Sequence, residues 1–161
     1  MRIFILVFIA IIFGIVGYEI KRKYIEQKNM IQFMKSFVEF LHINISVYKN
    51  DIQEIINNYI IQQNNKNAKY VNVFQKNNNF SAINVKILEK YILKEDLKYI
   101  IISYFQNLGM ADIDCECEKS KKLLMKLDGF LTEANDDIKL KGDLYFKLTL
   151  AIGVAFIVVL W

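Results

Sequence analysis

The sequence predicts an all-α protein in which a helical bundle is flanked by two membrane-spanning helices. Proline is absent and only 6 of the 161 residues are glycine, so little interrupts long helices. Hydrophobic residues make up 54% of the chain, and residues 3–18 and 148–161 carry no charge, whereas nearly all charged side chains lie between them. We therefore expect a six-helix cytoplasmic bundle over 21–141, whose first and last helices continue into transmembrane helices over 1–20 and 142–161.

The first uncharged stretch, residues 3–18, predicts a membrane-spanning helix that is only just long enough. At 1.5 Å per residue, its roughly 16 residues cover about 24 Å of a hydrocarbon core about 30 Å thick. Met1, Tyr18 and the long side chain of Lys21 would have to reach the interfaces. A cleaved signal peptide is the alternative, but the stretch has no Ala-x-Ala site and a charged cluster follows it directly.

The second uncharged stretch, residues 148–161, predicts a span of about 14 residues. It reaches about 18 residues if the apolar side chains at 144–146 enter the membrane while Lys147 extends toward the headgroups. Trp161 is suited to the far interface. A buried helix of a soluble protein is the alternative, but the stretch has no polar face to present to water.

Basic residues indicate the orientation of both spans. Three follow the first span and three precede the second, namely Lys21, Arg22, Lys23, Lys139, Lys141 and Lys147. Only Arg2 lies on the outer side. Because basic residues favour the cytoplasmic side, we expect the middle region in the cytoplasm and both termini across the membrane. Cys115 and Cys117 are consistent, as free thiols, with that reducing compartment.

The middle region begins with a helical hairpin. Residues 18–48 contain no glycine and repeat apolar side chains at spacings of three and four, which predicts a long amphipathic helix. Asp51 and Glu54 have the spacing of a capping box and open the second helix of the hairpin. Residues 70–74 predict a short third helix, and Ser81 is the expected N-cap of a fourth helix.

The fifth helix is expected to begin at Lys94 to Asp96 and to run to Leu108. Gly109 follows directly, where a left-handed C-cap favours glycine. Asp112 is then the expected N-cap of a long sixth helix that leads into the second span.

The sixth helix carries apolar and small residues with heptad-like spacing. They are Ile113, Cys117, Ser120, Leu124, Leu127, Leu131, Ala134 and Ile138. One interpretation is a coiled-coil dimer, and the other is packing on helices of the same chain. Cys117, Ser120 and Ala134 are weak dimer-forming residues, so they favour the second interpretation.

Small residues within both apolar stretches let helices approach closely. These expected packing positions are Ala10, Gly14, Gly17, Ala151, Gly153 and Ala155. They suit pairing of the two spans within one chain, and they also suit a homo-oligomer or a larger assembly.

The composition excludes most catalytic sites. A single histidine, His42, and two cysteines cannot fill a four-ligand zinc site, and the spacing of the glycines gives no phosphate-binding loop. The net charge of +4 is modest, and Lys119, Lys121, Lys122 and Lys126 are interleaved with Glu116, Glu118 and Asp128. We therefore expect a protein that is not an enzyme, that needs no cofactor or metal, and that does not bind nucleic acid.

At several positions the sequence resembles the stage III sporulation protein AB family. The soluble region of that family is similar to the cytoplasmic domain of the type II secretion protein F. The matching positions are Glu19 and Tyr24 after the first span, Leu41, Ile45, Ile52 and Glu54 around the hairpin turn, the motif Leu108-Gly109-x-x-Asp112, and Gly153. The motif is the most specific of these features.

The resemblance implies a platform in the mother-cell (outer forespore) membrane of a spore-forming bacterium. Its partners would be a cytoplasmic secretion-type ATPase, other SpoIIIA membrane proteins, and SpoIIQ, in a complex that links mother cell and forespore. We expect Lys49 and Glu54 of the first hairpin to contact the ATPase. A stand-alone membrane-anchored regulator or sensor is the alternative function.

Overall fold

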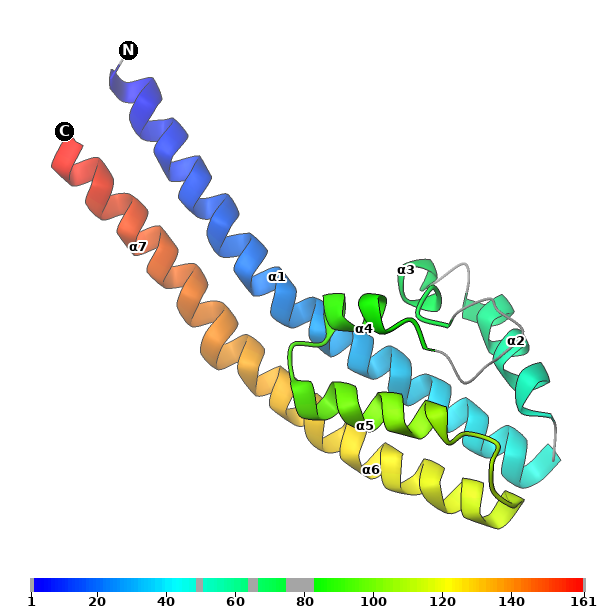
Figure 1. Ribbon diagram of the computed structural model, residues 1–161. Coiled ribbons are helices and arrows are strands. Elements are labelled where there is room, and N and C mark those ends of the chain that lie inside the picture. Colours follow the sequence, from blue (N-terminus) through cyan, green and yellow to red (C-terminus); the bar gives the residue numbers. More distant parts are fainter. Residues whose placement is uncertain (1, 49–50, 64–66, 75–82, 161) are drawn as a thin grey trace. The chain divides into compact units, whose positions relative to one another are not determined.

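The computed structural model describes residues 2–48, 51–63, 67–74 and 83–160, and within these ranges the chain is all-helical (Figure 1). The elements are α1 (Arg2–Ile43), η1 (Asn44–Tyr48), α2 (Ile52–Gln63), α3 (Ala68–Val71), α4 (Val85–Tyr91), α5 (Glu95–Gln106), α6 (Ile113–Asp137), η2 (Ile138–Gly142) and α7 (Asp143–Leu160). Because the π-helices η1 and η2 continue their neighbours without a break, the described part forms six continuous helical segments. The all-α prediction is confirmed.

The chain divides into two compact units. Unit 1 consists of residues 1–28 and 132–161, and unit 2 consists of residues 29–131. The expected membrane boundaries at 20/21 and 141/142 both fall inside unit 1 and stay predictions.

Unit 1 is a helical hairpin in which the start of α1 lies beside α7 (Figure 1). The rings of Phe13 and Phe156 stack with their centroids 5.6 Å apart. The ammonium of Lys21 lies 2.7 Å from the Asp143 carboxylate, so an ion pair also joins the two helices. Apolar and ionic contacts therefore both hold the hairpin together.

Large apolar side chains of unit 1 remain exposed on both helices. They include Val7, Phe8, Ile11, Ile15, Val16, Leu148, Ile152, Val154, Phe156 and Val158. Judged over the described residues, none of the helices combines the length and the apolar character needed to cross a bilayer.

Unit 2 encloses an aromatic core. Phe37 of α1 is fully buried, and its ring lies 5.1 Å from that of Tyr59, 4.6 Å from that of Phe74 and 5.5 Å from that of Phe105. Phe33, one turn earlier on α1, contacts the first two of these rings as well. The amphipathic pattern of α1 thus places one apolar face against α2, α5 and the segment after α3.

The start of α2 agrees with the sequence pattern, since the Gln53 backbone N–H donates to Asp51 Oδ1 at 2.7 Å. The start of α4 differs from the expectation. Ser81 lies outside the described residues, and the N-cap is Asn84, whose side chain accepts from the Ile87 N–H at 3.3 Å. The helix begins later than expected because Ile83 pairs with Phe74 in an isolated β-bridge.

Helix α5 ends at Gln106 instead of Leu108, with Asn107 as its C-cap. Helix α6 then uses much of its heptad-like face within the chain. Ser120 and Leu127 are fully buried, Leu124 and Leu131 are half-buried, and Ile113 is exposed. Ser120 also bonds to Tyr104 of α5, which supports packing on helices of the same chain.

Candidate functional site

The turn between α5 and α6 packs on the start of α2. Gly109 has a φ of 81°, which places it in the left-handed region as the sequence predicts. A Cβ at this position would lie 3.1 Å from Cδ1 of Ile52. Asp112 precedes α6, and its carbonyl accepts from the Glu116 N–H at 2.9 Å. Leu108, the first residue of the expected turn, is half-buried.

Glu116 holds this turn in place through hydrogen bonds of its side chain. Its Oε1 accepts from the Ala111 N–H at 3.3 Å and from the Lys119 ammonium at 3.0 Å. The carboxylate is buried, and its Oε2 has no hydrogen-bond partner. Such a carboxylate near a helix N-terminus is stabilised by the helix dipole as well as by its donors.

A cavity of about 190 Å³, which we call the tip pocket, lies where the two sequence motifs meet. Its walls come from the end of α1–η1, the start of α2 and the α5–α6 turn, and they include Ile45, Asp51, Ile52, Gly109 and Glu116. The hairpin turn and the Leu108-Gly109-x-x-Asp112 motif therefore form one surface. Spacing along the chain alone does not show this proximity.

Of the two residues expected to contact a partner, the structure describes one. Glu54 is exposed in the first turn of α2. Lys49 lies outside the described residues. The exposed carboxylate of Glu54 is accessible to a partner, and its contact with one stays a prediction.

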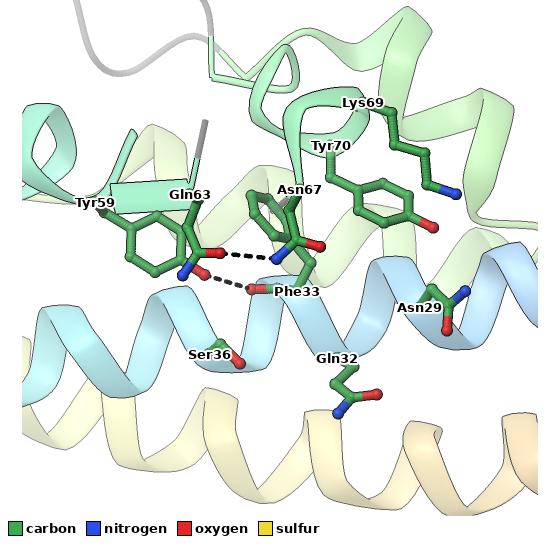
Figure 2. A pocket seen from close by; sticks show the side chains of 9 residues that line it. All are labelled: Asn29, Gln32, Phe33, Ser36, Tyr59, Gln63, Asn67, Lys69 and Tyr70. Atoms are coloured by element: carbon green, nitrogen blue, oxygen red, sulfur yellow. Dashed lines mark hydrogen bonds between the residues drawn. The ribbon is translucent and has the colours of Figure 1, made fainter. Parts of the chain in front are cut away.

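A second and larger cavity, of about 420 Å³, lies between α1 and the α2–α3 segment (Figure 2). Four amide side chains line it, those of Asn29, Gln32, Gln63 and Asn67. The Asn67 amide donates to Gln63 Oε1 at 2.7 Å. The cavity is therefore rich in hydrogen-bonding groups and is held by bonds of its own, a feature that the sequence pattern did not reveal.

Aromatic rings form the other wall of this amide-lined pocket. The Tyr59 hydroxyl donates to the Phe33 carbonyl at 3.3 Å (Figure 2). Burial raises the pKa of Tyr59, so its hydroxyl stays protonated and keeps this bond across the physiological range. Tyr70 lies on the same wall, with the Lys69 ammonium 4.7 Å from its ring centroid.

The expected packing glycines occupy different environments in unit 1. Gly17 and Gly153 are buried, and a Cβ at Gly153 would lie 3.0 Å from the Cβ of Phe13. A Cβ at Gly14 would meet nothing within 4 Å. Ala10, Ala151 and Ala155 are exposed. Only part of this set therefore lies between the two helices of the hairpin.

No metal site is formed among the described residues, because nowhere in them do three His, Cys, Asp or Glu side chains gather. His42 is half-buried, and its Nδ1 has no hydrogen-bond partner. Cys115 is exposed and Cys117 half-buried, and both are free thiols. This arrangement offers surfaces and pockets for binding, without a group of side chains suited to metal-assisted chemistry.

Comparison with known proteins identifies one family. The model of the stage III sporulation protein AB family matches residues 2–161. Comparisons with curated proteins and with solved structures gave no match.

Proposed function

Because the chain belongs to the stage III sporulation protein AB family, we propose that it is a non-enzymatic membrane platform for a cytoplasmic ATPase. The family makes it a protein of sporulation stage III and points to a spore-forming bacterium as its source. The proposed complex also contains the other SpoIIIA membrane proteins and SpoIIQ, and it links the mother cell to the forespore. In this complex the middle region would have the platform role that the cytoplasmic domain of protein F has in the type II secretion apparatus.

The exposed apolar surface of unit 1 carries this proposal. Phe8 is 64% exposed and Val158 is 70% exposed, and neighbouring apolar side chains extend the surface along both helices. Water disfavours a contiguous surface of this kind, so it requires a membrane or another protein to cover it. We assign the cover to the lipid of the mother-cell (outer forespore) membrane.

Charge supports an orientation with unit 2 in the cytoplasm. Arg22 and Lys23 are exposed just after the apolar stretch of α1, and Lys139 and Lys141 are exposed just before that of α7. Basic residues beside a membrane segment favour the cytoplasmic side. Unit 2 would then be accessible to a cytoplasmic partner.

The tip of unit 2 supports the proposed contact with the ATPase. The tip pocket joins the start of α2 to the α5–α6 turn, and Glu54 is exposed on α2 two residues after Ile52, which lines the pocket. Rigid turns with exposed charged side chains can give specificity without burying a large area.

Co-purification of the intact membrane protein from sporulating cells tests this function. The ATPase should be recovered with the parent chain, and Lys49→Glu and Glu54→Lys should reduce its recovery while helicity by circular dichroism stays unchanged. Lys49→Glu is the cleaner probe, because Glu54 also belongs to the expected capping box. If reversals across every exposed face left partner recovery and sporulation untouched, the platform function would be wrong.

The alternative, a membrane-anchored sensor or regulator, is favoured by the amide-lined pocket. Its volume of about 420 Å³ is suited to a small polar molecule. A small molecule that stabilises unit 2, together with no recovery of the ATPase in the co-purification, would favour this second function.

A further inference from the structure

A groove between α5 and α6 has a composition unlike that of the two pockets above. Its volume is about 420 Å³, and the two helices that form it lie side by side in unit 2 (Figure 1). Ile100 and Leu123 contribute aliphatic side chains, and Tyr99 and Tyr104 contribute rings. Tyr99 is 74% exposed, although a large ring is usually buried in a globular protein. The groove is thus a solvent-open hollow in which these apolar groups are accompanied, on the α5 side, by the polar side chains of Ser103 and Asn107.

Lysines line the α6 side of this groove. Lys119, Lys122 and Lys126 recur at spacings of three and four, so they lie on one face of the helix. These three lysines are the charged side chains among the described residues that line the groove.

The acidic residues interleaved with these lysines in the sequence do not cancel their charge in the structure. Glu116 is buried under the α5–α6 turn, where it neutralises only Lys119. The Asp128 carboxylate lies 2.6 Å from the Lys35 ammonium of α1. Glu118 lies 3.9 Å from Lys122, but both side chains are about three-quarters exposed, so this pair is weak. Lys122 and Lys126 therefore leave a net positive edge along the groove.

The groove is also held in a defined shape. The Ser120 hydroxyl donates to the Glu116 carbonyl at 2.8 Å, and the Tyr104 hydroxyl lies 2.9 Å from the same Ser120 oxygen. These bonds tie the side chain of Tyr104, which lines the groove, to α6. A surface that is formed in advance loses little conformational entropy on binding.

We propose that the α5–α6 groove binds an acidic amphipathic helix of a partner protein. The lining residues on this side run from Tyr99 of α5 to its C-cap Asn107, about 12 Å along the helix axis, which matches two turns of a third helix. Apolar side chains on one face of that helix would enter the hollow, in the manner of helix-in-groove recognition. Two carboxylates four residues apart would face Lys122 and Lys126.

This inference rests on the proposed function only in that the protein acts through contacts with other proteins. It does not require the partner to be the ATPase. Reversal of Lys49 or Glu54 would impair the tip contact and leave the groove intact, so failure of one proposal is distinguishable from failure of the other.

Photocrosslinking of the full chain in sporulating cells tests the groove. The crosslinker p-benzoylphenylalanine replaces Tyr99, which is exposed and resembles it in shape. We expect a crosslink to a protein segment with helical periodicity and acidic residues four apart, mapped by mass spectrometry. The combined change Lys122→Glu and Lys126→Glu should abolish the crosslink. Lys121→Glu is the matched control, because Lys121 is exposed on the same helix and does not line the groove.

Binding of a synthetic peptide with the mapped sequence gives the second measurement. With the full chain in detergent, fluorescence anisotropy should show binding that weakens about tenfold or more in the double variant. Exchange of the peptide's two acids for lysine should restore binding to that variant. A crosslink only to lipid, only to a second copy of this chain, or to a segment without acids would overturn the proposal, as would no crosslink.

Discussion

Gly17 of α1 lies so close to Thr149 of α7 that a Cβ at residue 17 would overlap the Thr149 hydroxyl. That hydroxyl is held in place, because its oxygen lies 2.9 Å from the carbonyl oxygens of both Tyr145 and Phe146, which share its one proton. The threonine cannot move aside without losing its bonds. Residue 17 must therefore lack a side chain for the unit 1 hairpin to pack as it does.

A pair of glycine-to-alanine changes tests this contact. In an open helix position alanine is favoured over glycine by about 0.5–1 kcal/mol, so Gly14→Ala should raise the stability of the full chain in detergent. Gly17→Ala should lower it instead, because the added methyl meets Thr149 and Phe146. Thermal unfolding by circular dichroism measures both. Equal shifts of the same sign would show that the two helices do not pack closely at Gly17.

The left-handed turn at Gly109 gives the second prediction. Gly109→Val should cost on the order of 1–2 kcal/mol, since a β-branched residue resists a positive φ and its Cβ would press on Ile52. Gly109→Asn is the control, because asparagine tolerates the left-handed region better and should cost less. Chemical unfolding of the two variants compares them, and equal losses would point to crowding at Ile52 as the sole cause.

The third prediction concerns alkaline pH. Burial raises the pKa of Tyr104 to about 12, above its ordinary value of 10.0. The unfolded chain then loses this proton at a lower pH than the folded chain, so the stability from Tyr104 is complete below pH 10 and is lost as pH rises toward about 12. Tyr104→Phe should make the fall of the free energy of unfolding with pH less steep in this range, as measured by chemical unfolding at a series of pH values.

The fourth prediction concerns membrane topology. In intact cells a membrane-impermeant thiol reagent should leave Cys115 and Cys117 unlabelled, although Cys115 is exposed on the protein surface. A cysteine added after Trp161 should react under the same conditions. Permeabilised cells provide the control, in which the native pair should also react. Labelling of Cys115 in intact cells would contradict the proposed orientation.

The sequence predicts features that depend on local chemistry and misses those that depend on distant contacts. The long helices follow from the absence of proline, and the positive φ of Gly109 follows from a turn that only glycine enters easily. The predicted start of α4 was wrong. Ile83 forms a bridge with Phe74, and these two residues are nine positions apart in the sequence. No local pattern reports such a pairing.

The same limit applies to the binding surfaces. In the sequence, Asp128 is a near neighbour of Lys126 and dilutes its charge. In the structure, Asp128 is engaged by Lys35, a residue of a different helix. The positive edge of the α5–α6 groove therefore depends on tertiary packing, and neither net charge nor spacing along α6 reveals it.

The π-helical turn η2 (Ile138–Gly142) determines how the long C-terminal helix responds to the deletion of a residue. A π-turn accommodates one residue more than an α-turn, and one residue corresponds to about 100° of rotation around the helix axis. Loss of a single residue from this turn would leave a continuous helix and its composition almost unchanged. Because the π-turn would then close to an α-turn with the same full rotation, Gly153 would still face Phe13, whereas deletion of a residue between Asp143 and Gly153 in α7 would turn Gly153 away from it by about 100°.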